Sequence, residues 1–252
     1  MGIQERKKRQ LAEREQCFLD QAWAMIERDG VLKLQMSKLA AECEYAVGTL
    51  YLHFSSKEDL LLELAIRSVQ DRLALYQQAV SWQAPSRHRM LAIVVANVLF
   101  AHQAPEFSRL SQYVSTNTIW MAASPERRQA ALKASEPIGE AVQSIVIDAI
   151  NVGDVCDHGL STSEVCAGLW AMTEGMHSLV GASGLLETHS VPKPFQLLMR
   201  HAHALLNGLG WQPLVDLGDT DFQSQLLETI MCEAFPNIPL SDCAAASPEN
   251  SF

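Results

Sequence analysis

Residues 34–62, LQMSKLAAECEYAVGTLYLHFSSKEDLLL, constrain the fold more than any other part of the chain. Two short helical patterns meet here across the turn ECEY, and AVGTLYLHF forms the second of them. Ser56, followed three residues later by Asp59 and then by an apolar run, is typical of a helix N-terminus and starts a third helix after Phe54. This layout is typical of a helix-turn-helix, so we interpret the second short helix as one that reads nucleic acid.

The sequence GTLYLHFSSKEDLL in this stretch resembles the signature of TetR-type transcriptional repressors. The resemblance covers residues 10–65, and the rest of the chain shares only the helical layout. In the turn and at the start of the second helix, the family usually has Gly, Ser and a basic residue, where this chain has Glu44, Ala46 and Val47. The resemblance implies a ligand-responsive repressor that binds a palindromic operator in double-stranded DNA.

Apolar residues recur at helical spacing along the remaining chain, which predicts an all-α protein. A first helix covers residues 10–29 and ends at Gly30, and a long helix runs from residue 57 to about residue 82. A further helix over residues 125–153 contains Pro137, which should kink or split it.

The chain is predicted to divide into four parts. These are a flexible basic arm (1–9), a three-helix DNA-binding domain (10–60), a larger helical ligand-binding and dimerisation domain (61–211), and a C-terminal extension (212–252) with a helix at about 221–235 and a disordered tail.

Helices predicted over residues 161–183 and 194–210 are rich in small and apolar side chains. Small side chains allow helices to approach each other closely. In the resembled family the last two long helices pair with their copies in a four-helix bundle, so the resemblance implies a homodimer.

The net charge of −10 is unevenly distributed. Residues 1–60 hold nine Lys and Arg against ten Asp and Glu, whereas the rest of the chain holds ten against nineteen. The basic residues include a cluster at Arg6, Lys7, Lys8 and Arg9. A locally basic face on an acidic protein predicts modest DNA affinity at physiological salt, because few phosphates are neutralised.

The sequence also argues against several protein classes. No run of about 20 apolar residues is present and the N-terminus is charged, so we expect no membrane association and a cytoplasmic location. The six cysteines form no CxxC pair, so we expect no metal site and no cofactor. Free thiols are the expected state, and a redox sensor is the alternative.

The second short helix supplies the first candidate DNA contacts. Its spacing directs Val47, Leu50 and Phe54 towards the other helices, and Thr49, Tyr51 and His53 outwards, where they can reach base edges and phosphates. The alternative for Tyr51 is a core aromatic packed against the first helix.

Four further residues complete the predicted DNA-binding set. Lys57 lies in the first turn of a helix, where free N–H groups attract a phosphate, although it could also be a solvated lysine. Gln35 and Lys38 lie at the start of the second helix of the domain. Gly48 costs helix stability, which close approach to DNA or to another helix would explain.

An apolar or aromatic effector is the predicted ligand of the second domain, because Met and aromatic side chains suit a greasy or planar molecule. The candidate ligand-binding residues are Phe100, His102, Tyr113, Trp120, Met121, Trp170, Met172, Met176 and His177. The alternative is that most of them form an ordinary core.

Two other functions are weighed against the repressor. A helical hydrolase could use Cys166 or Ser178 with His177, but no Gly-x-Ser-x-Gly motif occurs and neighbouring residues point to different sides of a helix. A helical adaptor that no longer binds DNA is consistent with Glu44, Ala46 and Val47 and with the net acidic charge. We therefore expect a DNA-binding regulator that is not an enzyme.

Overall fold

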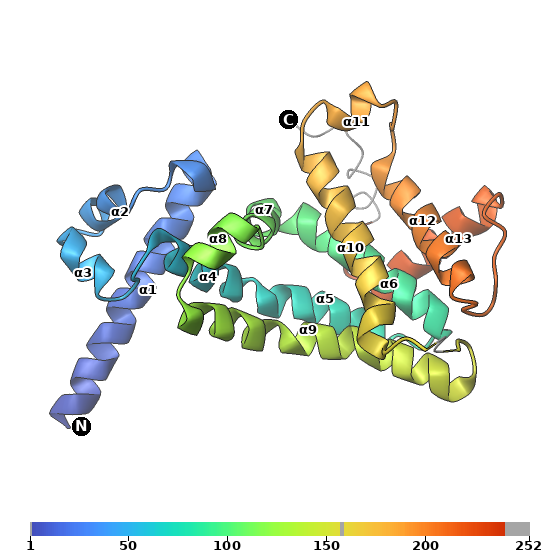
Figure 1. Cartoon of the computed structure of the whole chain (residues 1–252), viewed down its shortest axis with the longest axis horizontal. Coiled ribbons are helices and arrows are strands. Elements are labelled where there is room, and N and C mark those ends of the chain that lie inside the picture. Colours follow the sequence, from blue (N-terminus) through green and yellow to red (C-terminus); the bar gives the residue numbers. More distant parts are fainter. Residues whose placement is uncertain (1, 157–158, 240–252) are drawn as a thin grey trace. The chain divides into compact units, whose positions relative to one another are not determined.

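Every regular element that the structure describes is helical, which confirms the predicted all-α class (Figure 1). The computed structural model describes residues 2–156 and 159–239, and no strand occurs within them. The elements in chain order are α1 (Ile3–Asp29), η1 (Val31–Lys33), α2 (Met36–Glu42), α3 (Val47–Tyr51), α4 (Lys57–Arg67), α5 (Val69–Ser81), α6 (Ser86–Gln103), α7 (Pro105–Val114), α8 (Asn117–Ala122), α9 (Pro125–Val152), α10 (Thr162–Gly181), α11 (Leu185–Thr188), α12 (Pro194–Gly208), α13 (Thr220–Thr229) and η2 (Ile230–Ala234).

These helices form two units. Unit one comprises the chain up to Ser68 together with Glu106–Ser135, and unit two comprises Val69–Pro105 together with the chain from Glu136 onward. Unit one therefore contains α7, α8 and the first part of α9 in addition to the helix-turn-helix.

A single apolar core lies beneath the helix-turn-helix in unit one. Leu50 and Phe54 are fully buried in it, as predicted. Val47 was expected to face the same core but is 42% exposed, because it is the first residue of α3 and the core reaches only the later turn of this short helix. Other residues of this core are Phe18, Ala22, Ile26, Leu39, Leu60, Leu61, Leu64, Leu110 and Ile119.

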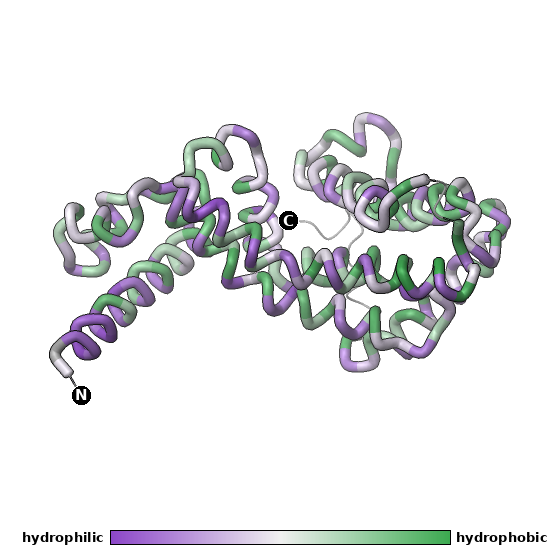
Figure 2. Tube along the Cα trace, turned by 60° about the horizontal axis from the view of Figure 1, so that its bottom comes forward, coloured by the Kyte–Doolittle hydropathy of each residue, from purple (hydrophilic) through white to green (hydrophobic). Residues whose placement is uncertain are grey.

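Helix α1 includes the basic residues that were predicted to form a mobile arm. It begins at Ile3, and its first turns are strongly hydrophilic (Figure 2). The Nε of Arg9 donates to Oε1 of Glu13 at 2.7 Å, and ion pairs at this spacing stabilise a helix by about 0.2–0.5 kcal/mol each. The helix ends at Gly30, with φ +84°, as predicted.

The long helix predicted over residues 57–82 is interrupted at Ser68. Helix α4 ends at Arg67 and α5 begins at Val69. The buried Ser68 hydroxyl donates to the Ala65 carbonyl at 2.9 Å, and such local bonds compete with the helical ladder. Helix α9, in contrast, runs unbroken through Pro137, so the predicted split does not occur.

Helix α6 forms the centre of unit two and packs against α5 and α12. It is buried along most of its length, which accounts for its nearly continuous apolar sequence. No single helix in the described part of the chain is long and apolar enough to cross a membrane, and α6 meets that test only as a bent pair with α7.

Helices α10 and α12 approach each other closely in unit two. A Cβ atom at Gly168 would lie 3.2 Å from Cδ2 of Leu205, so a larger residue there would require the Leu205 side chain to shift by a few tenths of an ångström. Trp170, on the same helix, is 68% exposed. The pair thus packs through small residues and leaves apolar side chains uncovered.

Arg87 joins the start of α6 to the end of α12. Its side chain is fully buried, and Nη1 donates to the Trp211 carbonyl at 2.6 Å, while Nη2 donates to the His203 carbonyl at 3.1 Å and to Oδ1 of Asn207 at 3.0 Å. Burial lowers the pKa of Arg87 to about 10, so the guanidinium stays charged at neutral pH. These three acceptors compensate the cost of burying that charge.

The C-terminal extension returns to unit two. Helix α13 and the π-helical η2 occupy the segment that was predicted to be one helix over residues 221–235. Most of the predicted disordered tail, from residue 240, lies outside the described residues.

Candidate nucleic-acid interface

The turn between α2 and α3 has the backbone of a helix-turn-helix although it contains no glycine. Glu44 takes φ +60°, in the left-handed region that favours glycine. The Glu44 N–H donates to the Ala41 carbonyl at 3.0 Å, and the Tyr45 N–H donates to the Ala40 carbonyl at 2.9 Å. The turn therefore keeps its shape at the cost of backbone strain at Glu44.

The outer face of α3 presents large side chains to solvent. Tyr51 is 48% exposed and Leu52, directly after the helix, is 85% exposed, whereas Leu50 beneath them is fully buried. Thr49 is half-buried. The core alternative for Tyr51 is wrong, and the outward position predicted for it is the one observed.

Gly48 lies on this face with open space around it. A Cβ atom built on Gly48 meets no atom of the described residues within 4 Å. A close contact with another helix of the same chain therefore does not account for this glycine. The other explanation for a helix residue that costs about 1 kcal/mol relative to alanine, close approach to DNA, stays a prediction.

His53 does not face outwards as predicted. Its side chain is only 4% exposed, and Nδ1 lies 3.4 Å from Oε2 of Glu15. The ring packs edge-on against Phe18 with a centroid separation of 5.5 Å. His53 follows the C-terminal end of α3, where the chain turns back under α1, so it is an internal contact of unit one.

The remaining predicted contacts lie near the starts of α2 and α4. Gln35 is the exposed N-cap residue of α2 and Lys38 is exposed in its first turn. The Nζ of Lys57 is 3.4 Å from the Val31 carbonyl, and burial lowers the pKa of Lys57 although Glu58 opposes that shift. The predicted cap of α4 is confirmed, because Oγ of Ser56 accepts from the Asp59 N–H at 3.0 Å.

Asp59, in the first turn of α4, also binds the residue that precedes α9. Its carboxylate is 2% exposed and accepts from Oγ of Ser55 at 2.5 Å and from the Ser124 N–H at 2.7 Å. Burial tends to raise the pKa of Asp59, but the bonds from Ser55 and Ser124 and the charge of Arg127 outweigh burial and hold the pKa below its usual value. The carboxylate thus stays ionised and ties α4 to the start of α9.

Arg127 on α9 is a residue of this region that the sequence analysis missed. It forms an ion pair with Glu63 on α4, and its Nη2 lies 3.6 Å from Oε1 of Glu15 on α1. No local motif in the sequence marks this arginine, since its partners are more than 60 residues away.

The nine predicted ligand residues are divided between the two units. Tyr113, Trp120 and Met121 are on α7 and α8 in unit one, where Tyr113 and Trp120 pack against the core beneath the helix-turn-helix. Their assignment to the ligand site stays a prediction. The other six are in unit two, where Phe100, Met176 and His177 are buried, Met172 is half-buried, and His102 and Trp170 are exposed.

His177 has the chemistry of a residue that could hold a polar group in an apolar interior. It is 7% exposed, and burial lowers its pKa to about 4, so the ring is neutral at physiological pH. The ring lies 5.3 Å from that of Phe195 on α12, a neighbour the sequence analysis did not identify. In the described part of the chain Nε2 finds no hydrogen-bond partner.

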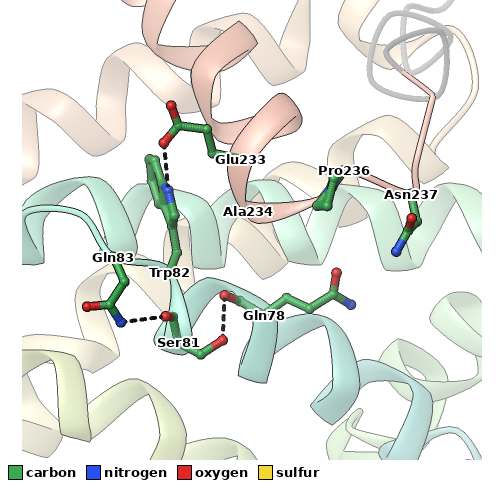
Figure 3. A pocket seen from close by; sticks show the side chains of 8 residues that line it. All are labelled: Gln78, Ser81, Trp82, Gln83, Glu233, Ala234, Pro236 and Asn237. Carbon is green, nitrogen blue, oxygen red and sulfur yellow. Dashed lines mark hydrogen bonds between the residues drawn. The ribbon is translucent and has the colours of Figure 1, made fainter.

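A surface hollow of about 580 Å³ lies elsewhere in unit two, between the end of α5 and η2 (Figure 3). Trp82 forms one side of it, and its Nε1 donates to Oε2 of Glu233 at 3.0 Å. The lining comprises Gln78, Ser81, Trp82, Gln83, Glu233, Ala234, Pro236 and Asn237, and includes none of the predicted ligand residues. Within the described ranges, no group of three or more His, Cys, Asp or Glu side chains is placed to hold a metal ion.

A strained helix-turn-helix with an exposed aromatic reading face on an all-helical chain defines a DNA-binding transcriptional regulator. Residues 18–64 match the family described as bacterial regulatory proteins, tetR family. These residues, which include the helix-turn-helix, are similar to the DNA-binding domain of the TetR family.

Several known proteins are similar to this chain. The fatty acid metabolism regulator protein of Bacillus subtilis (strain 168) is 25% identical over 153 residues, which are 60% of this chain and 71% of that protein. The structure of FadR from Bacillus subtilis in complex with stearoyl-CoA has a TM-score of 0.53 at 16% identity, over 77% of this chain and 96% of that one. RolR in complex with resorcinol has a TM-score of 0.59 at 12% identity, over 92% of this chain and 98% of that one. These two structures share the fold.

The strain at Glu44 yields a stability prediction. Glu44→Gly should raise the free energy of unfolding by about 1 kcal/mol, because a non-glycine residue in the left-handed region costs about 1–2 kcal/mol and glycine loses part of that gain through its unfolded-state entropy. Urea unfolding monitored by circular dichroism measures the change. Ala41→Gly, at an exposed position in α2, is the control and should lower stability by about 1 kcal/mol. An equal loss in both variants would contradict the strained turn.

Proposed function

We propose that the protein is a dimeric, ligand-responsive repressor that binds a palindromic operator in double-stranded DNA. The observation that carries the proposal is the two-sided build of α3, in which Leu50 and Phe54 are buried below while Tyr51 and Leu52 stay exposed above. Large side chains on the free face of a helix that follows a helix-turn-helix turn are suited to contact bases in a major groove. Thr49 and Gly48 are small residues on the same helix, and they allow the helix to approach the DNA backbone closely.

We propose that only a few basic side chains contact the DNA phosphates. Lys57 lies in the first turn of α4, where free N–H groups and the helix dipole attract an anion. Lys38 and Gln35 are exposed at the start of α2, and the basic first turns of α1 add positive charge. With so few cations, positioning on the DNA depends on helix geometry more than on the amount of charge. A regulator of this kind acts in the cytoplasm, where the DNA is.

The apolar side chains that α10 leaves exposed support a homodimer. Trp170 and Leu179 are 68% and 42% exposed, and the small residues Ala171 and Gly175 are exposed on the same helix. Apolar surface of this kind is typical of an interface between protein chains. Two-fold symmetry then presents two reading helices to half-sites one turn of DNA, about 34–36 Å, apart.

The effector is proposed to be an apolar or aromatic molecule bound within unit two. Support comes from the relative that regulates fatty acid metabolism and from the stearoyl-CoA and resorcinol complexes of proteins with this fold. Phe100, Met176 and His177 offer apolar contacts and one neutral hydrogen-bonding ring. A hydrolase is disfavoured, since burial raises the pKa of Cys166 to about 11 and keeps that thiol protonated.

Tyr51→Ala tests the reading helix. Affinity for a duplex enriched by this protein from random DNA should fall by about tenfold to a hundredfold, because a base-contacting side chain contributes about 1–3 kcal/mol. The dimer and the melting temperature should stay unchanged, since Tyr51 is exposed. Leu132→Ala, an exposed apolar truncation on α9, is the matched control and should bind as the wild type does. If no duplex is enriched at all, the protein is the helical adaptor instead.

The effector is tested by titration of the protein–duplex complex. Stearoyl-CoA should lower the affinity for the enriched duplex at least about fivefold, the lower end of typical allosteric coupling. Coenzyme A without the acyl chain is the control and should have no effect, and resorcinol tests the aromatic alternative. If neither stearoyl-CoA nor resorcinol changes the affinity for the duplex, an effector of this class is contradicted.

A further inference from the structure

Arg127 contacts the segment that follows α3 from the first turn of α9. Its Nη2 lies 3.4 Å from the carbonyl oxygen of His53, and its guanidinium lies 5.4 Å from the centre of the Phe54 ring. The same guanidinium is paired with Glu63 on α4 through Nη1, and with Glu15 on α1. One side chain therefore touches three other segments of unit one.

The contacts of Arg127 stabilise the C-terminal end of α3. A helix of five residues leaves its last carbonyl groups without helical partners, and it is too short to be stable by itself. The His53 carbonyl is directed to Arg127, and the His53 ring is held by Glu15, which Arg127 also pairs with. The guanidinium thus fixes both the backbone and the side chain at the end of the reading helix.

The position of Arg127 is itself fixed. Its backbone N–H donates to Oγ of Ser124 at 3.3 Å, and the Ser124 N–H donates to the buried carboxylate of Asp59 at 2.7 Å. Arg127 side-chain exposure is 23%, and that of Glu63 is 24%, so solvent screens this pair only in part. The start of α9 is therefore anchored to α4 by two separate contacts.

We propose that Arg127 is a positioning residue for DNA recognition, which sets the place of α3 without touching the DNA. The proposal rests on the DNA binding proposed above. A shift of α9 would carry Arg127 with it and displace the His53 carbonyl, so the first turn of α9 controls how Tyr51 is presented. Arg128, the next residue, is the natural comparison because its Nη1 donates to the thioether of Met121 at 3.4 Å, and not to the segment that follows α3.

A direct phosphate contact by Arg127 is the competing role, and Glu63 separates the two. If Arg127 acts by positioning, Glu63→Gln removes its anchor and weakens specific binding. If Arg127 touches phosphate, Glu63→Gln removes a repelling charge beside the DNA and strengthens binding. The two roles predict changes of opposite sign.

The test measures affinity of full-length Arg127→Ala, Arg127→Lys, Glu63→Gln and Arg128→Ala for the enriched duplex and for an unrelated duplex, over a series of salt concentrations. Specific affinity should fall about tenfold in Arg127→Ala and in Glu63→Gln, with Arg127→Lys falling between these and the wild type. Affinity for the unrelated duplex and the slope of log affinity against log salt should match the wild type. Arg128→Ala should bind as the wild type does.

Three results would overturn the proposal. A slope reduced by about 1 in Arg127→Ala, with loss on both duplexes, identifies a phosphate contact. Stronger binding by Glu63→Gln does the same, and it holds even if Arg127→Ala fails to fold. Unchanged specific affinity in Arg127→Ala removes the positioning role while leaving the proposed DNA binding intact. Failure of the wild type to enrich any duplex instead overturns the proposed function.

Discussion

The shortness of α3 is the constraint on which the reading function depends. Five residues cannot hold a helix in water, so tertiary contacts must determine where α3 lies. Burial of Leu50 and Phe54 supplies most of that stabilisation, at about 1.5–3 kcal/mol for each fully buried side chain. Arg127 and Glu15 then fix the end of the helix. Because the inner face is fully used for packing, the outer face can carry Tyr51 without loss of stability.

The same constraint explains the composition of unit one. Segment Glu106–Ser135 belongs to the unit that contains the helix-turn-helix, although it lies some 40 residues further along the chain. Leu110 and Ile119 fill the core beneath α4, and Ser124 bonds to Asp59. The reading domain is thus completed by helices that a sequence-based boundary at residue 60 leaves out. This arrangement places Arg127, in the first turn of α9, in contact with the segment that follows α3.

Local signals in the sequence predicted where several helices begin and end, but they did not predict all the long-range contacts between side chains. The Ser56 cap, the Gly30 stop and the buried Leu50 follow from spacing within a few residues. The prediction that His53 faces outwards was wrong because its partner Glu15 is 38 residues away in the sequence. Helical periodicity does not show where the chain turns back after a helix. Tyr113 was a candidate ligand residue, yet periodicity cannot say which of two cores a helix joins, and Tyr113 packs against the core of unit one.

The central claim is that α3 enters the DNA, and amide hydrogen exchange with and without the enriched duplex tests it most directly. We predict that bound duplex slows exchange at residues 47–54 and in the first turn of α4. Exchange within residues 18–26 of α1 should not change, because those amides lie in the middle of a long helix whose apolar side chains are already packed in the core of unit one. Protection that appears elsewhere on the chain, with none at residues 47–54, would contradict the account.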